Sequence, residues 1–339
     1  MTAGSQTRSS AAWDSSPATG LLPGVLVTVA VAALIPAVLS TALRLFPPTE
    51  DGAAMVASFI PYGLLGYGVA LLCLLLALLR SPRRRLLAGA AVVVLALSSG
   101  HVVWLAPLFV ADARPQVGPA FRLLTLNVYK GAADLFQVSG AASDVDVVVL
   151  IETTPEFLDR LQTPAWRERY PYVVGAGNEQ VSDTAVFSRF PLSGSQPLGP
   201  TSFSQWVMTV QVPGRSPVRL IAAHPCNPFC GSNLFASDHA LLRASVEANL
   251  VYPLVVVGDL NAIDDHAPLQ RLHRLGMRSA TDLLGAGWLP TYPANRVFPP
   301  VLPIDHVLVD DDLTATSLST VEVGGTDHRG LVVTLVGTR

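Results

Sequence analysis

Charged residues are scarce in this sequence. Only 14% of its 339 residues are Asp, Glu, Lys or Arg, whereas 50% are hydrophobic. A chain of this length can bury one sizeable core, but it is too apolar to be a single soluble domain. The apolar excess lies mainly before residue 110, where six Arg and no Lys stand against three acidic residues. We therefore expect this first part of the chain to lie in a membrane.

Positive charge is in short supply in the remainder of the chain. That part holds sixteen Lys and Arg against twenty-two Asp and Glu, a net charge of −6. Proteins that bind nucleic acid usually carry a surplus of basic residues that neutralises backbone phosphates. The composition thus argues against nucleic acid as a partner.

Cysteine is also rare, with three in the whole chain. Cys73 falls in an apolar run, whereas Cys226 and Cys230 lie four apart in Pro-Cys-Asn-Pro-Phe-Cys. Two ligands are too few for a metal site, which leaves a short disulfide in an oxidising compartment or two unpaired thiols. We favour the disulfide because the topology predicted below places this segment outside the cytoplasm.

Three apolar runs are long enough to cross a bilayer with a hydrocarbon core of about 30 Å, and they comprise residues 21–43, 53–79 and 86–110. Residues 1–20 are rich in Ser, Ala and Thr and predict a disordered cytoplasmic tail. His101, within the third run, is either a proton-relay residue or an imidazole hydrogen-bonded between helices, and we favour the second.

The orientation of the runs follows from one cluster of arginines. Arg80, Arg83, Arg84 and Arg85 separate the second and third runs, and the positive-inside rule makes that loop cytoplasmic. The N-terminus then lies inside. After a linker at residues 111–120, the domain of residues 121–339 lies outside.

Short strands of this domain end in polar side chains. Residues 255–257 are three valines that predict a buried strand, and Gly258 allows the turn that presents Asp259 and Asn261. Each such residue alone is equally well explained by an ordinary turn or a helix start. Eight of them flank predicted strands in the same way, which indicates one shared site: Asn127, Glu152, His224, Asp259, Asn261, Asp305, Asp327 and His328.

This set of side chains suits the hydrolysis of a phosphate ester or anhydride. Carboxylate and amide oxygens hold a hard divalent cation, imidazoles donate hydrogen bonds or move protons, and a carboxylate with an amide aligns water. We interpret the neighbouring Asp264, Asp265 and His266 as the solvated start of a helix rather than as metal ligands, and His306 as structural.

The motifs also resemble a known family. In order along residues 121–338, the chain resembles the endonuclease/exonuclease/phosphatase superfamily through Leu-Asn127-Val, Ile-Glu152, Ser188-Arg189-Phe-Pro, Ala-His224, Gly-Asp259-Leu-Asn261, Ile-Asp305-His306 and Thr-Asp327-His328. With three apolar runs in front, it further resembles actinobacterial membrane proteins linked to teicoplanin and vancomycin resistance. The resemblance implies a DNase I-like α/β four-layer sandwich, with two mixed β-sheets flanked by helices, after three transmembrane helices.

The same resemblance implies ligands and substrate contacts. Glu152 would be the main Mg²⁺ ligand, with Asn127 beside it and Asp327 near the metal, and Mn²⁺ is the alternative ion. Arg189 would contact a substrate phosphate.

Catalytic roles are implied for the remaining motifs. His328, oriented by Asp305, would transfer a proton or bind the scissile phosphate, and His224 would stabilise charge on the phosphoryl oxygens. Asp259 and Asn261 would position the attacking water. Whether Asp259 or His328 is the general base stays open.

Family membership does not fix the substrate. We expect a membrane-anchored, Mg²⁺-dependent phosphoesterase or pyrophosphatase acting outside the cytoplasm on a lipid-linked phosphate, in its sharpest form an undecaprenyl (pyro)phosphate of cell-wall synthesis, with a contribution to glycopeptide resistance. The alternatives are an extracytoplasmic nuclease, a sphingomyelinase- or phospholipase C-like enzyme, and a non-catalytic membrane sensor of a cell-wall intermediate.

Overall fold

The computed structural model of the protein describes residues 18–48, 50–175 and 183–339. Residues 1–17 of the predicted tail lie outside the described residues, and helix α1 (Ala18–Leu45) already begins at Ala18. The chain divides into two compact units. One comprises Tyr62–Gly100 with the chain up to Leu39, and the other comprises Ser40–Pro61 with His101–Arg339.

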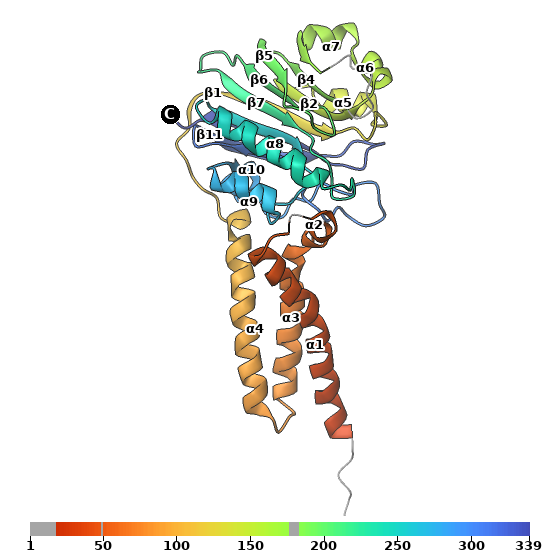
Figure 1. Ribbon diagram of the computed structural model, residues 1–339, viewed down its shortest axis with the longest axis vertical. Helices are drawn as coiled ribbons and strands as arrows, with labels where there is room; N and C mark the ends of the chain where they lie inside the picture. Colours follow the sequence, from red (N-terminus) through yellow and green to blue (C-terminus); the bar gives the residue numbers. More distant parts are fainter. Residues whose placement is uncertain (1–17, 49, 176–182) are drawn as a thin grey trace, which may run out of the picture. The chain divides into compact units, whose positions relative to one another are not determined.

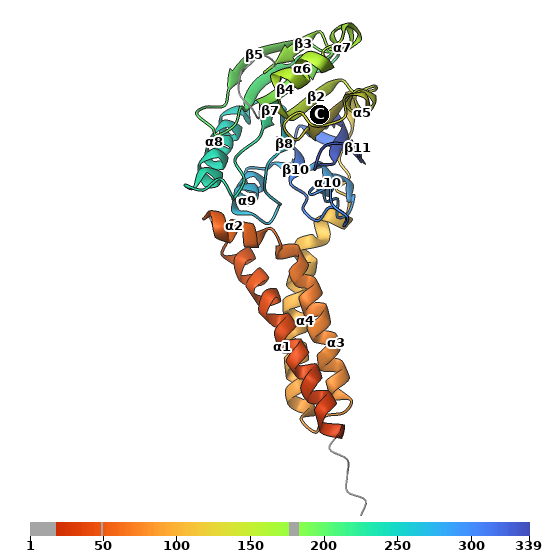
Figure 2. The ribbon, with the colours of Figure 1, turned by 90° about the vertical axis from the view of Figure 1, so that its right-hand side faces the viewer.

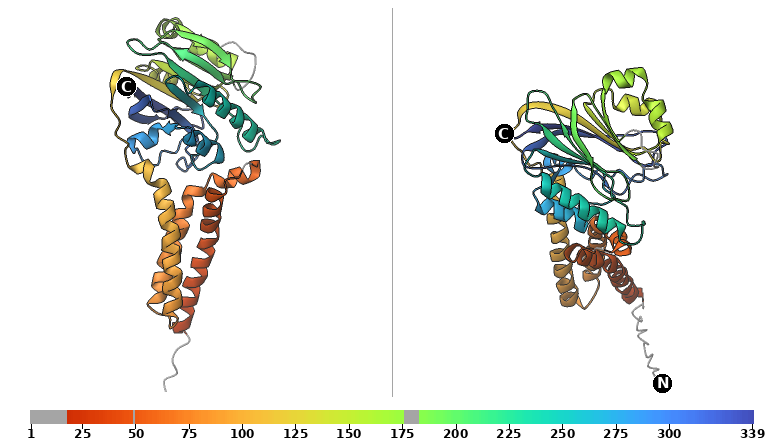
Figure 3. Two further views of the ribbon diagram at one scale, coloured as in Figure 1. Left: turned by 60° about the vertical axis from the view of Figure 1, so that its left-hand side comes forward. Right: turned by 45° about the horizontal axis from the view of Figure 1, so that its top comes forward.

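The first unit is built from three apolar helices, α1, α3 (Gly63–Leu78) and α4 (Arg84–Leu105), which Figure 3 shows side by side. Small residues let α1 and α3 approach closely, since a Cβ on Gly66 would lie 2.8 Å from the carbonyl oxygen of Ala33. Three segments are apolar and long enough to cross a membrane: Leu22–Leu45, Ile60–Leu78 and Arg84–Phe109.

The second apolar run differs from its predicted extent of residues 53–79. Its beginning forms a separate short helix, α2 (Asp51–Ala57), followed by the 3₁₀ turn η1 (Ile60–Tyr62). Ala54 of α2 is fully buried in an apolar cluster of the second unit, together with Phe235 and Leu269. The prediction was wrong at this boundary because an apolar segment buried in protein has the same composition as one in lipid.

The second unit contains two six-stranded mixed sheets (Figure 1). The first has the order β11 (Leu313–Val321), β12 (Gly330–Gly337), β1 (Val117–Asn127), β2 (Val147–Thr153), β4 (Asp183–Ser188) and β3 (Tyr172–Val174). The second has the order β5 (Leu192–Pro197), β6 (Trp206–Val210), β7 (Val218–Ala223), β8 (Leu254–Asp259), β10 (Asp305–Val309) and β9 (Arg278–Ser279). Strands β1 and β2 are parallel, as are β7 and β8, and the other pairs are antiparallel.

Helices cover the outer faces of both sheets (Figure 2). The first sheet packs on α5 (Leu135–Ala141), α6 (Pro155–Leu161) and α7 (Pro164–Arg169), and the second on α8 (Leu234–Asn249) and α9 (Ala267–Arg274). Alternation along each strand fills the layers, since Leu123 faces the core between the sheets and Leu124 faces the helices. Helix α10 (Ala280–Leu284) adds Ala280 and Leu283 to the central core. The predicted four-layer sandwich is confirmed.

Residues 264–266 precede helix α9 as expected, with His266 at its N-cap, but they are not solvated. His266 is buried and accepts a hydrogen bond from Ile263 N–H, so its Nε2–H donates to the carbonyl oxygen of Ala54, 2.7 Å away. Asp265 forms an ion pair with Arg44 at 2.6 Å. The segment Ser40–Pro61 is thereby fastened to the sandwich.

His101 is hydrogen-bonded between helices, as expected. Its Nε2 lies 3.0 Å from Thr41 Oγ1 of α1. The chain then passes through the 3₁₀ turn η2 (Ala106–Phe109) into the second unit.

Candidate active site

Strand pairing brings the predicted site residues to one edge of the two sheets. Asn127 is paired with Ile151 across parallel strands β1 and β2, which places it beside Glu152. In the other sheet Asp259 is directly opposite Asp305, and Ala223 is opposite Gly258, which places His224 next to Asp259. A Cβ on Gly258 would lie 2.0 Å from the carbonyl oxygen of Ala223, so only glycine fits this close approach.

Asp259 joins the two sheets at the centre of the site. Its Oδ2 accepts a hydrogen bond of 3.0 Å from Asn127 Nδ2, and its Oδ1 accepts one of 2.9 Å from Asn261 N–H. Burial raises the pKa of Asp259 to about 7, a rise that the positive charge of His328 opposes and the negative charge of Asp305 reinforces. The carboxyl group can therefore take up and release a proton near neutral pH.

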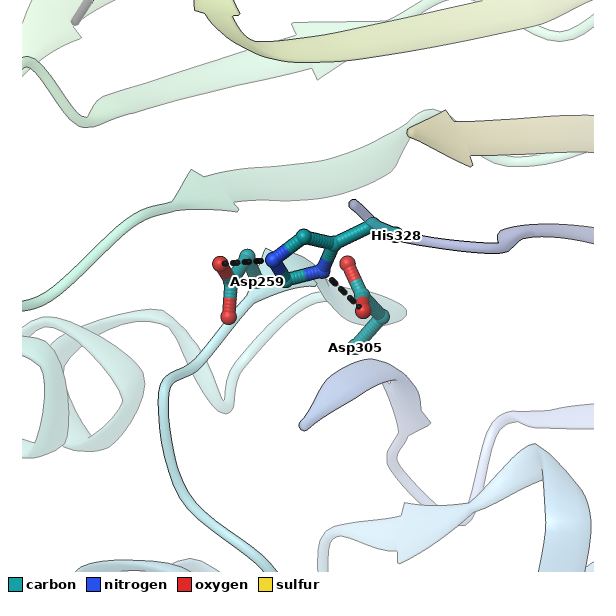
Figure 4. A group of neighbouring side chains, drawn as sticks. All are labelled: Asp259, Asp305 and His328. Atoms are coloured by element: carbon teal, nitrogen blue, oxygen red, sulfur yellow. Dashed lines mark hydrogen bonds and ion pairs between the residues drawn. The ribbon is translucent and has the colours of Figure 1, made fainter. Parts of the chain in front are cut away.

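His328 lies between two carboxylates, as Figure 4 shows. Its Nδ1 donates to Asp305 Oδ2 at 2.8 Å, and its Nε2 lies 3.6 Å from Asp259 Oδ2 and 3.9 Å from Asp327 Oδ1. Burial lowers the pKa of His328, but Asp305, Asp259 and Asp327 together outweigh it and raise the pKa to about 10. At neutral pH this imidazole is consequently a cation.

His224 has the opposite protonation state. Burial, followed by the positive charge of His328, lowers the pKa of His224 to about 3. Its ring stacks on Phe203 with centroids 4.5 Å apart, and its Nε2 lies 3.9 Å from Glu152 Oε1 and 4.0 Å from Asp259 Oδ2. A neutral imidazole held in this way can donate one hydrogen bond to a phosphoryl oxygen.

Three carboxylate oxygens of the site are free to bind a divalent cation. Glu152 Oε2, Asp305 Oδ1 and Asp327 Oδ1 are buried without a hydrogen-bond partner among the described residues. The negative charge of Glu152 also acts on Asp327, where burial is the main cause of a raised pKa. Buried oxygens of this kind are costly unless a cation or a donor compensates them, and hard divalent ions prefer oxygen ligands.

Glu152 is held in an unusual backbone conformation. Its φ is +59°, in the left-handed region, and the pairing of β2 with β4 shifts register between Leu150 and Thr153. Non-glycine residues in this region are uncommon and often occur at functional sites. Asn127 Nδ2 donates to Glu152 Oε1 at 3.1 Å, which leaves Oε2 for the ion.

A second group of ligand-type atoms occurs at the same site. Asp259, Asp305 and His328 bring such atoms within 4.8 Å of one another, which is close enough to hold a metal ion. Both ring nitrogens of His328 face carboxylates, so the same trio can also hold and move a proton.

The structure corrects the prediction for Arg189. This residue follows β4 at the end of the sheet opposite to Glu152, because Ser188 pairs with Val147 at the start of β2. Its guanidinium lies 3.5 Å from Asp146 Oδ1 and donates to the carbonyl oxygen of Ser143 at 3.1 Å. Six residues of strand separate Asp146 from Glu152, or about 20 Å. Arg189 thus fastens a loop and does not reach the site.

The loop after His224 is closed by a disulfide between Cys226 and Cys230, which confirms the favoured alternative. Cys226 N–H donates to Asp238 Oδ2 at 3.0 Å, and the carbonyl oxygen of Pro225 accepts from Asn261 Nδ2 at 3.0 Å. The disulfide loop thereby orders the backbone on which both His224 and Asn261 depend.

Several residues at the site were not predicted from the sequence. Tyr292 packs on the ring of His328 with centroids 4.9 Å apart, and Phe203 stacks on His224. Thr326 Oγ1 donates to the carbonyl oxygen of Asn127 at 2.6 Å and accepts from His328 N–H at 3.1 Å. These contacts lie between distant chain segments, and only the Thr before Asp327 was part of a recognised motif.

A family model for the endonuclease/exonuclease/phosphatase family matches residues 124–328, which is more than half of the chain. The chain belongs to this family. Together with the acidic and histidine cluster, the assignment makes the protein a metal-dependent hydrolase of phosphoric esters or anhydrides. No curated protein sequence matches the chain significantly.

Solved structures of other proteins show the same fold. TDP2 from D. rerio, complexed with single strand DNA product, has a TM-score of 0.54 and 15% identity over 64% of this chain and 98% of that one. The 3′ phosphatase NExo from Neisseria, bound to a product DNA hairpin, has a TM-score of 0.52 and 18% identity over 63% and 98%. The family member from Bacteroides vulgatus has a TM-score of 0.52 and 15% identity over 64% and 98%.

Proposed function

We propose that the protein is a membrane-anchored, Mg²⁺-dependent hydrolase of a lipid-linked phosphate or pyrophosphate. The observation that carries the proposal is that the second unit holds both the phosphohydrolase site and Ser40–Pro61, the segment between the first two candidate spans. An active site fastened to the chain between two spans works at a membrane surface. Phosphate-bearing lipids are the substrates concentrated there.

The side of the membrane follows from charge and from the disulfide. Arg80, Arg83, Arg84 and Arg85 lie between α3 and α4 and favour a cytoplasmic position for that loop. The catalytic unit then faces the opposite side, where the disulfide Cys226–Cys230 can persist. Attaching a reporter whose activity depends on an extracytoplasmic location at residue 339 tests this orientation, and an inactive reporter there with an active one at residue 82 would overturn it.

The chemistry assigned to each side chain follows from its protonation state. Asp259, with a pKa of about 7, accepts the proton of the attacking water, which Asn261 helps to place. His328 is cationic and binds a phosphoryl oxygen or returns a proton to the leaving group, and neutral His224 donates a hydrogen bond. Mg²⁺ held by Glu152 and Asp327 would neutralise phosphate charge, and Asn127, which donates to Glu152 Oε1, would orient that carboxylate.

The most specific substrate that we propose is an undecaprenyl (pyro)phosphate. Its hydrolysis outside the cytoplasm would affect cell-wall synthesis and contribute to glycopeptide resistance. The support for this substrate is the sequence resemblance together with the membrane attachment. A sphingomyelinase- or phospholipase C-like activity uses the same site chemistry and differs only in the headgroup.

A nuclease is the second candidate, because TDP2 and NExo were solved with DNA. The net charge of −6 after residue 110, with Lys130 as the only lysine, disfavours a polyanionic strand. A non-catalytic sensor is the third candidate. It is disfavoured because the chain is a family member that keeps Asp259, Asp305 and His328, with His328 hydrogen-bonded to Asp305.

Phosphate release by the detergent-solubilised full chain tests the proposal. Undecaprenyl pyrophosphate, undecaprenyl phosphate, sphingomyelin and single-stranded DNA serve as parallel substrates, with and without chelator. We expect Mg²⁺-dependent turnover of at least one lipid, and its loss in His328→Ala but not in Val251→Ser, an exposed position at the opposite end of β8. Turnover of DNA alone would refute the lipid proposal.

A further inference from the structure

The segment of residues 291–303, here called the 291–303 loop, is joined to the catalytic residues at its base. Thr291 Oγ1 accepts from Asp305 N–H at 3.3 Å, and Ala294 N–H donates to the carbonyl oxygen of Asp327 at 2.6 Å. Tyr292 packs on His328, and Tyr292 N–H donates to Leu302 at 3.0 Å, which closes the base of the loop. The base of the loop therefore lies directly against the catalytic residues.

The tip of this loop, residues 296–298, combines one cation with two apolar side chains. Val297 is completely exposed, and Phe298 is 49% exposed. Arg296 is also exposed and forms no ion pair with the part of the chain that the structure describes. Its positive charge nevertheless acts on the Tyr292 hydroxyl, as do the negative charges of Asp327 and Asp259, so Arg296 lies within electrostatic reach of the site.

Two other loops that leave the site also present apolar side chains. Tyr129 follows Asn127 and is 42% exposed, and Phe229 lies in the disulfide loop after His224 and is 76% exposed. Single exposed apolar residues are ordinary, and here three loops next to catalytic residues each carry at least one. A free cation beside apolar side chains matches a ligand with a phosphate at one end and hydrocarbon next to it.

We propose that Arg296, Val297 and Phe298 are specificity-determining residues that bind the phosphate-proximal part of a lipid phosphate. Arg296 pairs with a phosphate oxygen that is not being attacked, and Val297 and Phe298 cover the first hydrocarbon units. The inference rests on the proposed lipid substrate and assigns its recognition to one loop.

Nucleic acid fits the tip less well. Aromatic side chains can stack on bases, and Phe298, Tyr129 and Phe229 offer such rings, but proteins that bind single strands combine stacking with a positively charged groove for the phosphate backbone. The scarcity of basic residues in the same unit gives no path for a phosphate backbone. The occupant that the tip fits is therefore a lipid phosphate.

The test compares two pyrophosphates that share the scissile bond and differ in hydrocarbon length, isopentenyl and farnesyl pyrophosphate, below their micelle concentrations. The full chain in detergent is assayed for phosphate release. For V297S/F298S we expect kcat/KM for the farnesyl substrate to fall about tenfold or more, because burying apolar side chains of this size contributes that much. We expect a smaller loss of kcat/KM for the isopentenyl substrate, because it offers only the first of these hydrocarbon units to the two side chains.

A cation variant tests the other half of the tip. R296Q should raise KM for both substrates by about tenfold with kcat nearly unchanged, as expected for an interaction made equally in the ground and transition states. The matched controls are V251S for the apolar change and R160Q for the charge change. Both residues are exposed and lie away from the site, so they should change neither parameter.

The outcomes separate the inference from the proposed function. Wild-type turnover of the farnesyl substrate with equal losses on both substrates in V297S/F298S, or with no loss, would overturn the inference and leave the proposed function intact. A wild-type enzyme that cleaves neither pyrophosphate nor undecaprenyl pyrophosphate but cleaves single-stranded DNA would overturn both.

Discussion

Replacing Asp305 by Asn tests the central assignment, which is that His328 works as a cation held by carboxylates. The hydrogen bond from His328 Nδ1 to Asp305 Oδ2 is 2.8 Å long, and both side chains are buried. A hydrogen bond to a charged partner contributes about 1.5–3 kcal/mol, and one pKa unit corresponds to about 1.4 kcal/mol. Asp305→Asn should therefore lower the pKa of His328 from about 10 by about 1–2 units.

The assay is the pH dependence of kcat/KM for phosphate release. Because the pKa of Asp259 is about 7 and Asp259 must be ionised, activity should rise through neutral pH. It should fall again as His328 loses its proton, near pH 10 in the wild type and near pH 8–9 in Asp305→Asn, by the shift estimated above. The variant should also lose about 100-fold in kcat at pH 7.5, since proton transfer groups contribute about 10²–10⁴. An alkaline limb that does not move, in a variant with wild-type circular dichroism and melting temperature, would refute the reasoning.

Three further predictions concern the metal ligand Glu152, the disulfide between Cys226 and Cys230, and Arg189, which does not reach the site. Glu152→Gln should abolish Mg²⁺ binding in calorimetric titrations and reduce turnover by about 100-fold or more, and retention of wild-type Mg²⁺ affinity would contradict its role as ligand. The double variant Cys226→Ser/Cys230→Ser should lower the free energy of unfolding by about 2 kcal/mol in denaturant titrations, because a short loop is no longer closed in the unfolded chain, and an unchanged midpoint would count against that contribution. Arg189→Gln should lower that free energy by about 1 kcal/mol through loss of its partners Asp146 and Ser143, yet leave kcat/KM within about twofold, and a large loss of activity would show that Arg189 acts at the site after all.

The fold was predictable from the sequence where strands are buried on both faces. The valine runs of β2 and β8 have no polar alternation, and this pattern predicts central strands of a sandwich. Strand β11 was not foreseen. It forms the edge of its sheet, and its sequence Leu-Thr-Ala-Thr-Ser-Leu-Ser-Thr-Val alternates too weakly to be distinguished from a polar loop.

The site residues were foreseeable because each lies at a strand end or within three residues of one, and strand ends at one sheet edge converge. The errors arose where a side chain finds a partner far along the chain. Arg189 pairs with Asp146, 43 positions away, and His266 contacts Ala54, 212 positions away. A local sequence pattern carries no information about partners that lie so far apart along the chain. For the same reason the sequence did not reveal Phe203 and Tyr292. Their rings pack on His224 and His328, which lie far from them along the chain.

The contact between Ala54 and His266 bears on how the enzyme can be prepared. A fragment beginning after residue 110 would keep every catalytic side chain but would leave the His266 Nε2–H without its acceptor and remove Ala54 from the apolar cluster around Phe235. In such a truncated enzyme, the surface that Ser40–Pro61 normally covers would be exposed to solvent. Supplying that segment in trans as a peptide, or fusing it ahead of residue 101, is the more promising route to a water-soluble form.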